Sequence, residues 1–348
     1  MSVNAHDVEY IELYASDREQ TTDHFVTSWG FRETAHAATD TMESVVLRQG
    51  NVQLVVTSGP VTRDFLAAHG DGIADIAFAC ADPAAAAESA RAAGARACPP
   101  GGPGGPAVHG FGDVRHTLLQ RDAGSPPGLP RGRGWTPAGP APEGADSRDP
   151  APELRRLDHI AVCLEAGSLH DVARFYQEAF GHQQVSTEYV EVGGQAMDSI
   201  ATRSPSGGIT FTFLEPDTAK QPGQINEFLA RNGGAGVQHL AFLLDEIVPS
   251  VLEFEARGVE FLRTPDTYYD ALAERIPGLG QEVADLRKTS VLADRDEWGH
   301  LLQLFARSPF EQRTLFFELI QRQGARGFGS ANIRALYEAV QRSQQHSS

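Results

Sequence analysis

The stretch "LDHIAVCLEAG", residues 157–167, has the pattern of a short strand that runs into a helix over 168–180. The same pattern recurs in three other places along the chain. These are "VEYIELYAS" (8–16) with a helix over 16–29, "ADIAFACAD" (74–82) with a helix over 82–94, and "VQHLAFLLD" (237–245) with a helix over 246–258. Such recurrence of one supersecondary unit is typical of a fold built from repeats.

Strand-like runs follow the helices. They are 44–50 and 52–59 after the first helix, 197–204 and 209–216 after the third, and 289–294, 300–308 and 315–323 after the fourth. Several helices are expected to end at glycine, the residue that most readily closes a helix in the left-handed region, as at Gly30, Gly181 and Gly258. We therefore predict an α+β fold of four βαβββ modules arranged as two pairs. An unrelated α+β fold with chance internal similarity is the alternative.

Two Pro/Gly-rich stretches interrupt this pattern. Residues 99–110 cannot sustain a helix or strand and indicate a surface loop. Residues 123–153 have the composition of an interdomain linker, in which the basic run "RGRG" (131–134) is expected to be solvated. The predicted domains are therefore 1–122 and 154–348, joined by the linker 123–153.

The composition narrows the class of protein. The chain has 348 residues, 41% hydrophobic and 22% charged, which is typical of a soluble globular protein. Its net charge of −17 argues against nucleic acid or an anionic membrane as partner. Three cysteines without a CxxC pair, no signal-peptide pattern at the start and no apolar run near about 18 residues favour a cytoplasmic location.

Two histidines and a glutamate occupy matched places in the C-terminal modules. His159 and His239 are each the third residue of their module's first strand, and Glu318 lies at a nearly equal interval further on, in the last predicted strand. The corresponding positions of the N-terminal half hold Tyr10, Asp75 and Thr117. This asymmetry predicts that any metal chemistry belongs to the C-terminal half.

Two imidazoles and one carboxylate on one face form the ligand set of non-haem Fe(II) oxygenases, which leaves positions open for a 2-oxo acid and O₂. The alternative is that the histidines are satisfied core residues, although burying an unpartnered carboxylate such as that of Glu318 is costly. The segment "HGD" (69–71) also matches a short H-x-D metal signature. We expect it to be a loop that leads into a strand, and do not assign it a metal.

Residues 157–340 resemble the 4-hydroxyphenylpyruvate dioxygenase family, within the vicinal-oxygen-chelate superfamily. The resemblance rests on "LDHIAV", "QAMDSIATRSPSGGITFTFLEP", "GQINEFL", "GAGVQHLAF", "GVEFLRTPDTYY", "LLQLF" and "FFELIQRQGARGFGSANIRALYEAV". "HGDGIADIAF" and "GFGDVRHTLLQRD" extend it more loosely into the N-terminal half. It implies two open-barrel domains, Fe(II) bound by His159, His239 and Glu318, and an arylpyruvate substrate that reacts with O₂. The resemblance also allows the chain to form a homodimer.

The family forms two products, homogentisate by ring hydroxylation and 4-hydroxymandelate by benzylic hydroxylation. The ring-hydroxylating pattern "IPLNE" reads "FTFLE" in this chain, with Thr212 and Leu214, and "GNFKALFE" reads "ANIRALYE", with Ile333 and Tyr337. These departures favour 4-hydroxymandelate, a precursor of the hydroxyphenylglycine of peptide antibiotics, because isoleucine at 333 lets the substrate ring tilt away. The alternatives are the homogentisate-forming dioxygenase, a non-catalytic binding or resistance module and, less favoured, a Zn or Ni isomerase.

The resemblance also implies the remaining pocket residues. Polar positions that could orient the substrate are Ser199, Thr212, Gln224 and Gln303, with a further hydroxyl from Tyr337. Apolar walls are expected from Leu214, Phe317 and Phe328, which would keep water from the reaction. The helix after "GFGSAN" is expected to close over the pocket as a lid.

Overall fold

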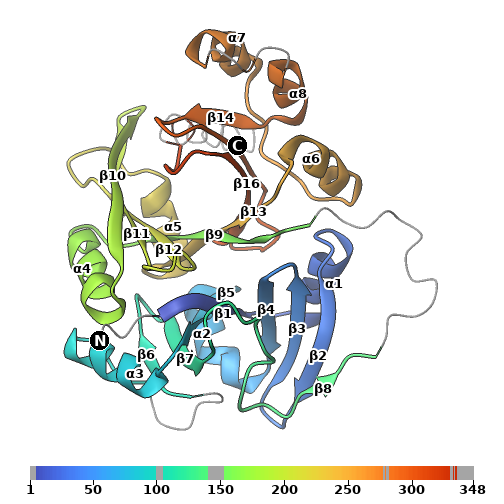
Figure 1. Cartoon of the computed structure of the whole chain (residues 1–348), viewed down its shortest axis with the longest axis vertical. Coiled ribbons are helices and arrows are strands. Elements are labelled where there is room, and N and C mark those ends of the chain that lie inside the picture. The colour runs from blue at the N-terminus through green and yellow to red at the C-terminus, as the bar shows by residue number, and fades with distance from the viewer. Residues whose placement is uncertain are drawn as a thin grey trace.

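The computed structural model describes residues 5–98, 105–139, 153–276, 279, 282–329, 332 and 334. Each half of the chain forms one eight-stranded sheet. Figure 1 shows the two sheets curled one above the other, with the N-terminal sheet below and the C-terminal sheet opening as a cup above it.

The N-terminal sheet has the strand order β6-β7-β5-β1-β4-β3-β2-β8. Its first module consists of β1 (Ala5–Tyr14), α1 (Arg18–Thr27), β2 (Arg32–Ala38), β3 (Glu43–Gln49) and β4 (Val52–Ser58). A short 3₁₀ turn (Pro60–Thr62) and α2 (Arg63–His69) lead to the second module, which consists of β5 (Gly72–Cys80), α3 (Pro83–Ala92), β6 (Ala107–His109) and β7 (Arg115–Gln120). An isolated bridge between Ala97 and Val108 adds to this shorter module.

The C-terminal sheet has the order β10-β11-β12-β9-β13-β16-β15-β14. The third module consists of β9 (Arg156–Cys163), α4 (Leu169–Phe180), β10 (Gln183–Val192), β11 (Gln195–Arg203) and β12 (Thr210–Pro216). After α5 (Gln224–Asn232), the fourth module consists of β13 (Gly236–Leu243), α6 (Ile247–Ala256), α7 (Asp266–Arg275), α8 (Glu282–Thr289), β14 (Leu292–Arg295), β15 (His300–Phe305) and β16 (Phe316–Gln323).

One pairing rule organises both sheets. The last strand of each module runs parallel to its first strand, as in β1·β4, β5·β7, β9·β12 and β13·β16. The first strands of paired modules run antiparallel, as in β1·β5 and β9·β13. The predicted α+β fold of four modules in two pairs is therefore confirmed.

Helices α1, α3, α4 and α6 lie within the four predicted helical segments, but α1 ends at Thr27 with Ser28 as its C-cap, so the expected end at Gly30 is wrong. Asp17 caps α1 by accepting a hydrogen bond from the Gln20 N–H, and Asp82 caps α3 in the same way through Ala85. Gly181 ends α4 with φ of 72°, a conformation that costs residues with a Cβ more than glycine. No helix in the described ranges has the length and apolar character needed to cross a membrane.

The two halves share one hydrophobic core. Trp29, which follows α1, lies with its ring centroid 5.1 Å from that of Phe254 and 5.4 Å from that of Phe317, both in the C-terminal half. Phe25 also lies 5.4 Å from Phe317. These aromatic pairs bind the halves into one packed body.

Part of the predicted linker packs on the N-terminal sheet. Its residues Thr136–Pro137 form β8, which pairs with β2 at the sheet edge. The Arg133 side chain is only 3% exposed and lies 2.6 Å from Oε1 of the buried Glu12. The expected solvation of the run 131–134 is therefore wrong for Arg133, because a buried carboxylate needs an opposite charge beside it. Linker residues 140–152 lie outside the described residues.

Candidate metal centre

Three neighbouring strands bring His159, His239 and Glu318 to one face of the C-terminal sheet. Strand β13 lies between β9 and β16, and its Ala241 stands opposite both His159 on β9 and Glu318 on β16. His239 is two residues before Ala241 and therefore points to the same face. The matched positions noted in the sequence are thus adjacent in space.

The three side chains converge on one point. His159 Nε2 lies 3.3 Å from His239 Nε2, and these nitrogens lie 3.4 and 3.2 Å from Glu318 Oε2. His159, His239 and Glu318 are 4%, 8% and 1% exposed. Two ligands bound at about 2.1 Å from one ion at right angles are about 3 Å apart, so this spacing fits a shared divalent ion. It is the one cluster of this kind within the described ranges.

The charges of the three groups are set by burial and by each other. Burial raises the pKa of Glu318, but hydrogen bonds from the two histidines outweigh it and bring the pKa to about 2. Burial lowers the pKa of His159, but hydrogen bonds to Asp158 and Glu318 raise it to about 9. Burial lowers the pKa of His239, which is partly opposed by Glu318. A metal ion would therefore displace a proton from His159 on binding.

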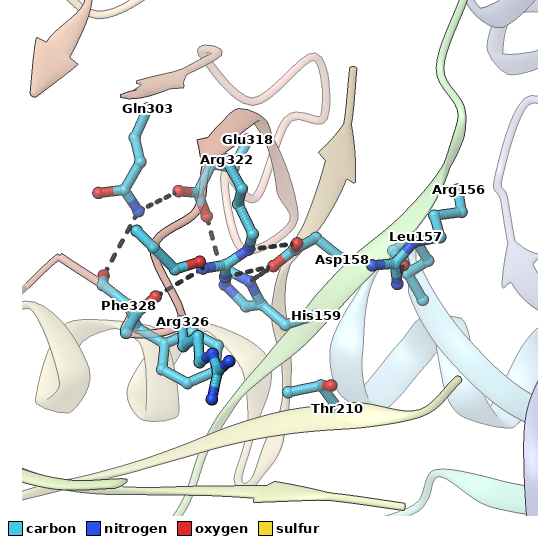
Figure 2. Close-up of polar contacts among 12 residues, drawn as sticks. Arg156, Leu157, Asp158, His159, Thr210, Gln303, Glu318, Arg322, Arg326 and Phe328 are labelled. Atoms are coloured by element: carbon cyan, nitrogen blue, oxygen red, sulfur yellow. Dashed lines mark hydrogen bonds and ion pairs between the residues drawn. The ribbon is translucent and has the colours of Figure 1, made fainter. Parts of the chain in front are cut away.

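Asp158 and Arg322 support His159 on its Nδ1 side, away from the other two side chains of the cluster (Figure 2). His159 Nδ1 donates to Asp158 Oδ1 at 3.0 Å, so that Nε2 faces the cluster. Arg322 donates to both Asp158 oxygens, at 2.7 and 2.8 Å. The same guanidinium donates to the carbonyls of Ala325 and Gly327, at 3.2 and 2.7 Å. Sequence reasoning missed both residues, although the Asp-His pair in "LDHIAV" was a visible signal.

Gln303 and Asn332 support Glu318 on its other side. Gln303 Nε2 donates to Glu318 Oε1 at 2.7 Å and to the Phe328 carbonyl at 3.4 Å. Gln303 Oε1 accepts from Asn332 Nδ2 at 2.8 Å. Gln303 was expected to orient the substrate, whereas in this structure both ends of its amide hold Glu318 and the segment beside it.

A cavity of about 460 Å³ opens in front of the three side chains. Its apolar wall includes Met197, Ile225, Phe228, Phe305 and Phe316. Six of the predicted pocket residues line it, namely Ser199, Thr212, Leu214, Gln224, Gln303 and Phe328. A cavity of this size whose wall combines apolar and polar side chains suits a small aromatic acid.

Phe317 does not line this cavity and is a correction to the predicted pocket. It is 0% exposed and packs against Phe25 and Trp29 of the N-terminal half. Consecutive residues of a strand point to opposite faces, so Phe317 cannot share a face with Glu318. Ile333 and Tyr337 lie outside the described residues, as does the predicted lid helix apart from residues 332 and 334.

Glu188 on β10 is a cavity residue that the sequence did not indicate. Its Oε2 is buried and has no hydrogen-bond partner among the described residues. Burial raises the pKa of Glu188, and the nearby Asp294 raises it further. A carboxyl group in this environment keeps its proton to a higher pH than an exposed glutamate does.

The segment "HGD" has no metal-ligand geometry. His69 ends α2 and does not belong to a loop, so that part of the expectation is wrong. Its Nδ1 donates to the Asn232 carbonyl at 2.5 Å, and its Nε2 lies 3.0 Å from Asp113 Oδ2. Asp71 instead accepts hydrogen bonds from Ser16. The two side chains of the motif therefore have different partners.

Comparisons with known proteins agree with this geometry. Residues 156–304 match the Glyoxalase/Bleomycin resistance protein/Dioxygenase superfamily, and residues 2–125 match the family described as Hydroxyphenylpyruvate dioxygenase, HPPD, N-terminal. A solved triple mutant of 4-hydroxymandelate synthase from Streptomyces coelicolor has a TM-score of 0.85 and 48% identity, covering 98% of this chain and 99% of that chain. A xylose isomerase-like TIM barrel/4-hydroxyphenylpyruvate dioxygenase fusion protein has a TM-score of 0.76 and 26% identity, covering 99% of this chain and 53% of that chain.

Two curated relatives extend the similarity. The 4-hydroxyphenylpyruvate dioxygenases of Aspergillus fumigatus and Neurospora crassa are 28% and 29% identical to this chain. Those alignments cover 97% and 98% of this chain and 92% of each relative. They agree with the predicted enzyme class, a non-haem iron dioxygenase, and with the predicted vicinal-oxygen-chelate fold. The chain belongs to the hydroxyphenylpyruvate dioxygenase family.

Proposed function

We propose that the chain catalyses the Fe(II)-dependent oxidative decarboxylation and benzylic hydroxylation of 4-hydroxyphenylpyruvate by O₂, giving 4-hydroxymandelate and CO₂. The reaction balances, because one oxygen atom enters the new carboxylate and the other enters the benzylic hydroxyl group. The observation that carries the proposal is the His159–His239–Glu318 cluster at one cavity, in a chain 48% identical to a 4-hydroxymandelate synthase.

The donor set fits a divalent iron ion. Two imidazoles and one carboxylate suit a borderline divalent metal, and three protein ligands leave three positions of an octahedral ion open. Bound iron would supply the activation of O₂ and an attachment point for the 2-oxo acid group. Glu318 offsets only one of the two positive charges, so the site keeps a net attraction for an anionic substrate.

The cavity residues would hold the substrate in one orientation. Thr212, Ser199 and Gln224 are polar groups on its wall, and Phe328 and Phe316 supply apolar contact for the ring. The Ser199 hydroxyl donates to the Glu188 carbonyl at 3.1 Å, so its oxygen can still accept a hydrogen bond from the substrate. Small shifts in ring placement decide which carbon lies within reach of the oxidant. Leu214 offers no polar anchor at its place on the wall, which supports benzylic attack.

Product identification tests the proposal. The purified protein is incubated with Fe(II), O₂ and 4-hydroxyphenylpyruvate, and CO₂ release is measured together with the aromatic product. Homogentisate and 4-hydroxymandelate are isomers, so chromatography against authentic standards must separate them. We expect 4-hydroxymandelate as the main product, with equimolar CO₂. Homogentisate as the main product, or no CO₂ release, would contradict the proposal.

The homogentisate-forming reaction is the second candidate, because both curated relatives described above are named 4-hydroxyphenylpyruvate dioxygenase. Ile333→Phe, which introduces the residue of the ring-hydroxylating pattern, discriminates between the two reactions. We expect this variant to release CO₂ but to form a larger share of homogentisate, because the bulkier ring displaces the substrate ring. Full turnover with an unchanged product ratio would show that residue 333 does not select the product.

A further inference from the structure

A second cavity, of about 530 Å³, lies where the start of β1 meets the loop 204–209 and the end of β16. Four arginines line it, namely Arg156, Arg203, Arg322 and Arg326. None of its lining residues belongs to the substrate cavity. Figure 2 shows the Arg322 side chain joined to Asp158, and Arg326 beside Phe328. This cavity is therefore a separate place on the molecule.

Most of the positive charge around this cavity has no counter-charge. Arg322 is paired with Asp158, and Asp7, which also lines the cavity, is paired with Arg121 at 2.7 Å. No ion pair to Arg156, Arg203 or Arg326 is found within the part of the chain that the structure describes. These three guanidinium groups, of which Arg203 also feels the nearby Asp158, make the wall of this cavity locally positive in a chain of net charge −17.

Arg203 and Arg326 make contacts that hold their side chains in place but do not neutralise their charge. Arg203 Nε donates to Thr210 Oγ1 at 3.2 Å. The Arg326 guanidinium lies 5.0 Å from the Trp298 ring centroid, while Asp296 accepts from the backbone N–H of Arg326 at 2.7 Å. Burial, and then the nearby Arg322, lower the pKa of Arg203. Like charges gathered in this way repel each other unless an anion lies between them.

We propose that this cavity binds a small multivalent oxyanion of the phosphate class, either free or as a phosphate ester. Guanidinium groups present paired N–H donors that match phosphate oxygens. The Thr210 hydroxyl accepts from Arg203 and so keeps its own proton for a ligand oxygen. His6, also on the wall, has a buried Nε2 with no partner among the described residues. More than one negative charge is needed to balance three arginines.

Titration calorimetry on the full chain, purified without added metal, tests this proposal. The probes are inorganic phosphate, pyrophosphate and adenosine monophosphate, each at the same ionic strength. We expect saturable binding of pyrophosphate, and the third probe shows whether an ester is accepted as well as free phosphate. Arg203→Gln and Arg326→Gln should each weaken pyrophosphate binding at least tenfold.

Two controls make the result specific. Arg32→Gln removes an exposed arginine of β2 on the other sheet and should leave binding unchanged. Thr210→Val removes only a hydroxyl group and provides a second variant should an arginine variant fail to fold. No saturable binding in the wild type, equal weakening in Arg32→Gln, or displacement of pyrophosphate by 4-hydroxyphenylpyruvate would overturn the proposal. Displacement would place the anion in the substrate cavity. None of these readouts depends on turnover.

Discussion

At the scale of single residues, Asp158 decides which nitrogen of His159 faces the cavity. Its carboxylate holds the Nδ1 proton, and Arg322 keeps that carboxylate ionised by donating to both of its oxygens. Burial opposes ionisation of Asp158, but hydrogen bonds from Arg322 and His159 hold its pKa far below the usual range. An imidazole fixed in this way offers a single, correctly aimed Nε2 lone pair to a metal ion.

Asp158→Asn tests this support. The asparagine keeps the size of the side chain but loses the charge that pairs with Arg322, and its amide can also point its N–H₂ toward His159. We expect iron affinity to fall about 10- to 100-fold. Competition with a chelator measures that affinity, and circular dichroism confirms that the variant is folded. Asp171→Asn, at an exposed carboxylate, is the matched control. Equal iron affinity in both variants would contradict the assigned role.

The sequence predicted the cluster itself better than its surroundings. His159, His239 and Glu318 could be found because each occupies a matched strand position, and strand pairing turns matched positions into neighbours. The contact of Asp158 with His159 could not be predicted from strand alternation, which normally separates adjacent side chains. Phe317 was misplaced because this same alternation was not applied to it.

At the scale of elements, both sheets use one arrangement of strands for different purposes. In the N-terminal half, Asp75 takes the place of His239, but it accepts from Thr117 Oγ1 at 2.5 Å and from Arg115 Nε at 2.8 Å. Arg115 and Arg133 also pair with Glu12. The region that holds the ligand cluster in the C-terminal half is therefore occupied by internal ion pairs in the N-terminal half.

Strands with regular patterns were predictable, but the packing of the Pro/Gly-rich segment was not. Its composition lacks any periodic signal, and β8 forms only because β2 offers a free edge. Arg133 is likewise buried by a tertiary partner, Glu12, that lies far away in the sequence. Local composition indicates neither the short strand β8 (Thr136–Pro137) nor which side chains of the segment are buried.

Arg133→Met tests whether this segment stabilises the N-terminal half. The variant leaves Glu12, which is 0% exposed, with Arg115 as its remaining ion-pair partner at 3.2 Å. We expect the free energy of unfolding to fall by about 3 kcal/mol, the lower end for breaking a buried ion pair. Urea unfolding measures the change. The exposed neighbour gives the control Arg131→Met, for which we expect a change within about 0.5 kcal/mol.

A double variant separates the two possible causes of this loss of stability, the unpaired charge and the lost packing. If the loss comes from the unpaired carboxylate, adding Glu12→Gln to Arg133→Met should recover part of the stability, because the buried charge is then removed as well. Equal stability of Arg133→Met and Arg131→Met would mean that the segment only covers the sheet and contributes little to folding.

At the scale of the whole molecule, the two halves are joined by aromatic packing and by buried hydrogen bonds. His116 on β7 is 0% exposed, donates from Nδ1 to the Ile76 carbonyl at 2.9 Å, and accepts at Nε2 from the Tyr176 hydroxyl of α4 at 2.6 Å. This chain of contacts runs from the N-terminal sheet into the C-terminal half. In the neutral imidazole, Nδ1 donates to Ile76 and Nε2 accepts from Tyr176, so both ring nitrogens have a partner.

The burial of His116 makes the stability of the molecule sensitive to acid. Burial lowers the pKa of His116 from 6.5 to about 4, only partly opposed by its bond to Ile76. Between these two values the unfolded chain binds a proton that the folded chain does not, so stability falls as the pH falls. The contribution is fully present above pH 6.5 and decreases toward pH 4. Nearby His182, with a pKa of about 3, acts in the same direction.

His116→Gln isolates the contribution of this residue, since the glutamine amide can also donate to Ile76 and accept from Tyr176 but does not titrate. Urea unfolding at pH 7 and at pH 5 gives the loss of stability for each protein. We expect the loss in the variant to be smaller than in the wild type by about 2 kcal/mol, the linkage expected for one histidine with these pKa values. Titrating carboxylates affect both proteins alike and cancel in the comparison, whereas the variant also loses the lowering effect of the His116 charge on the pKa of His182. Equal losses in the two proteins would mean that His116 accepts a proton without disturbing the contact between the halves.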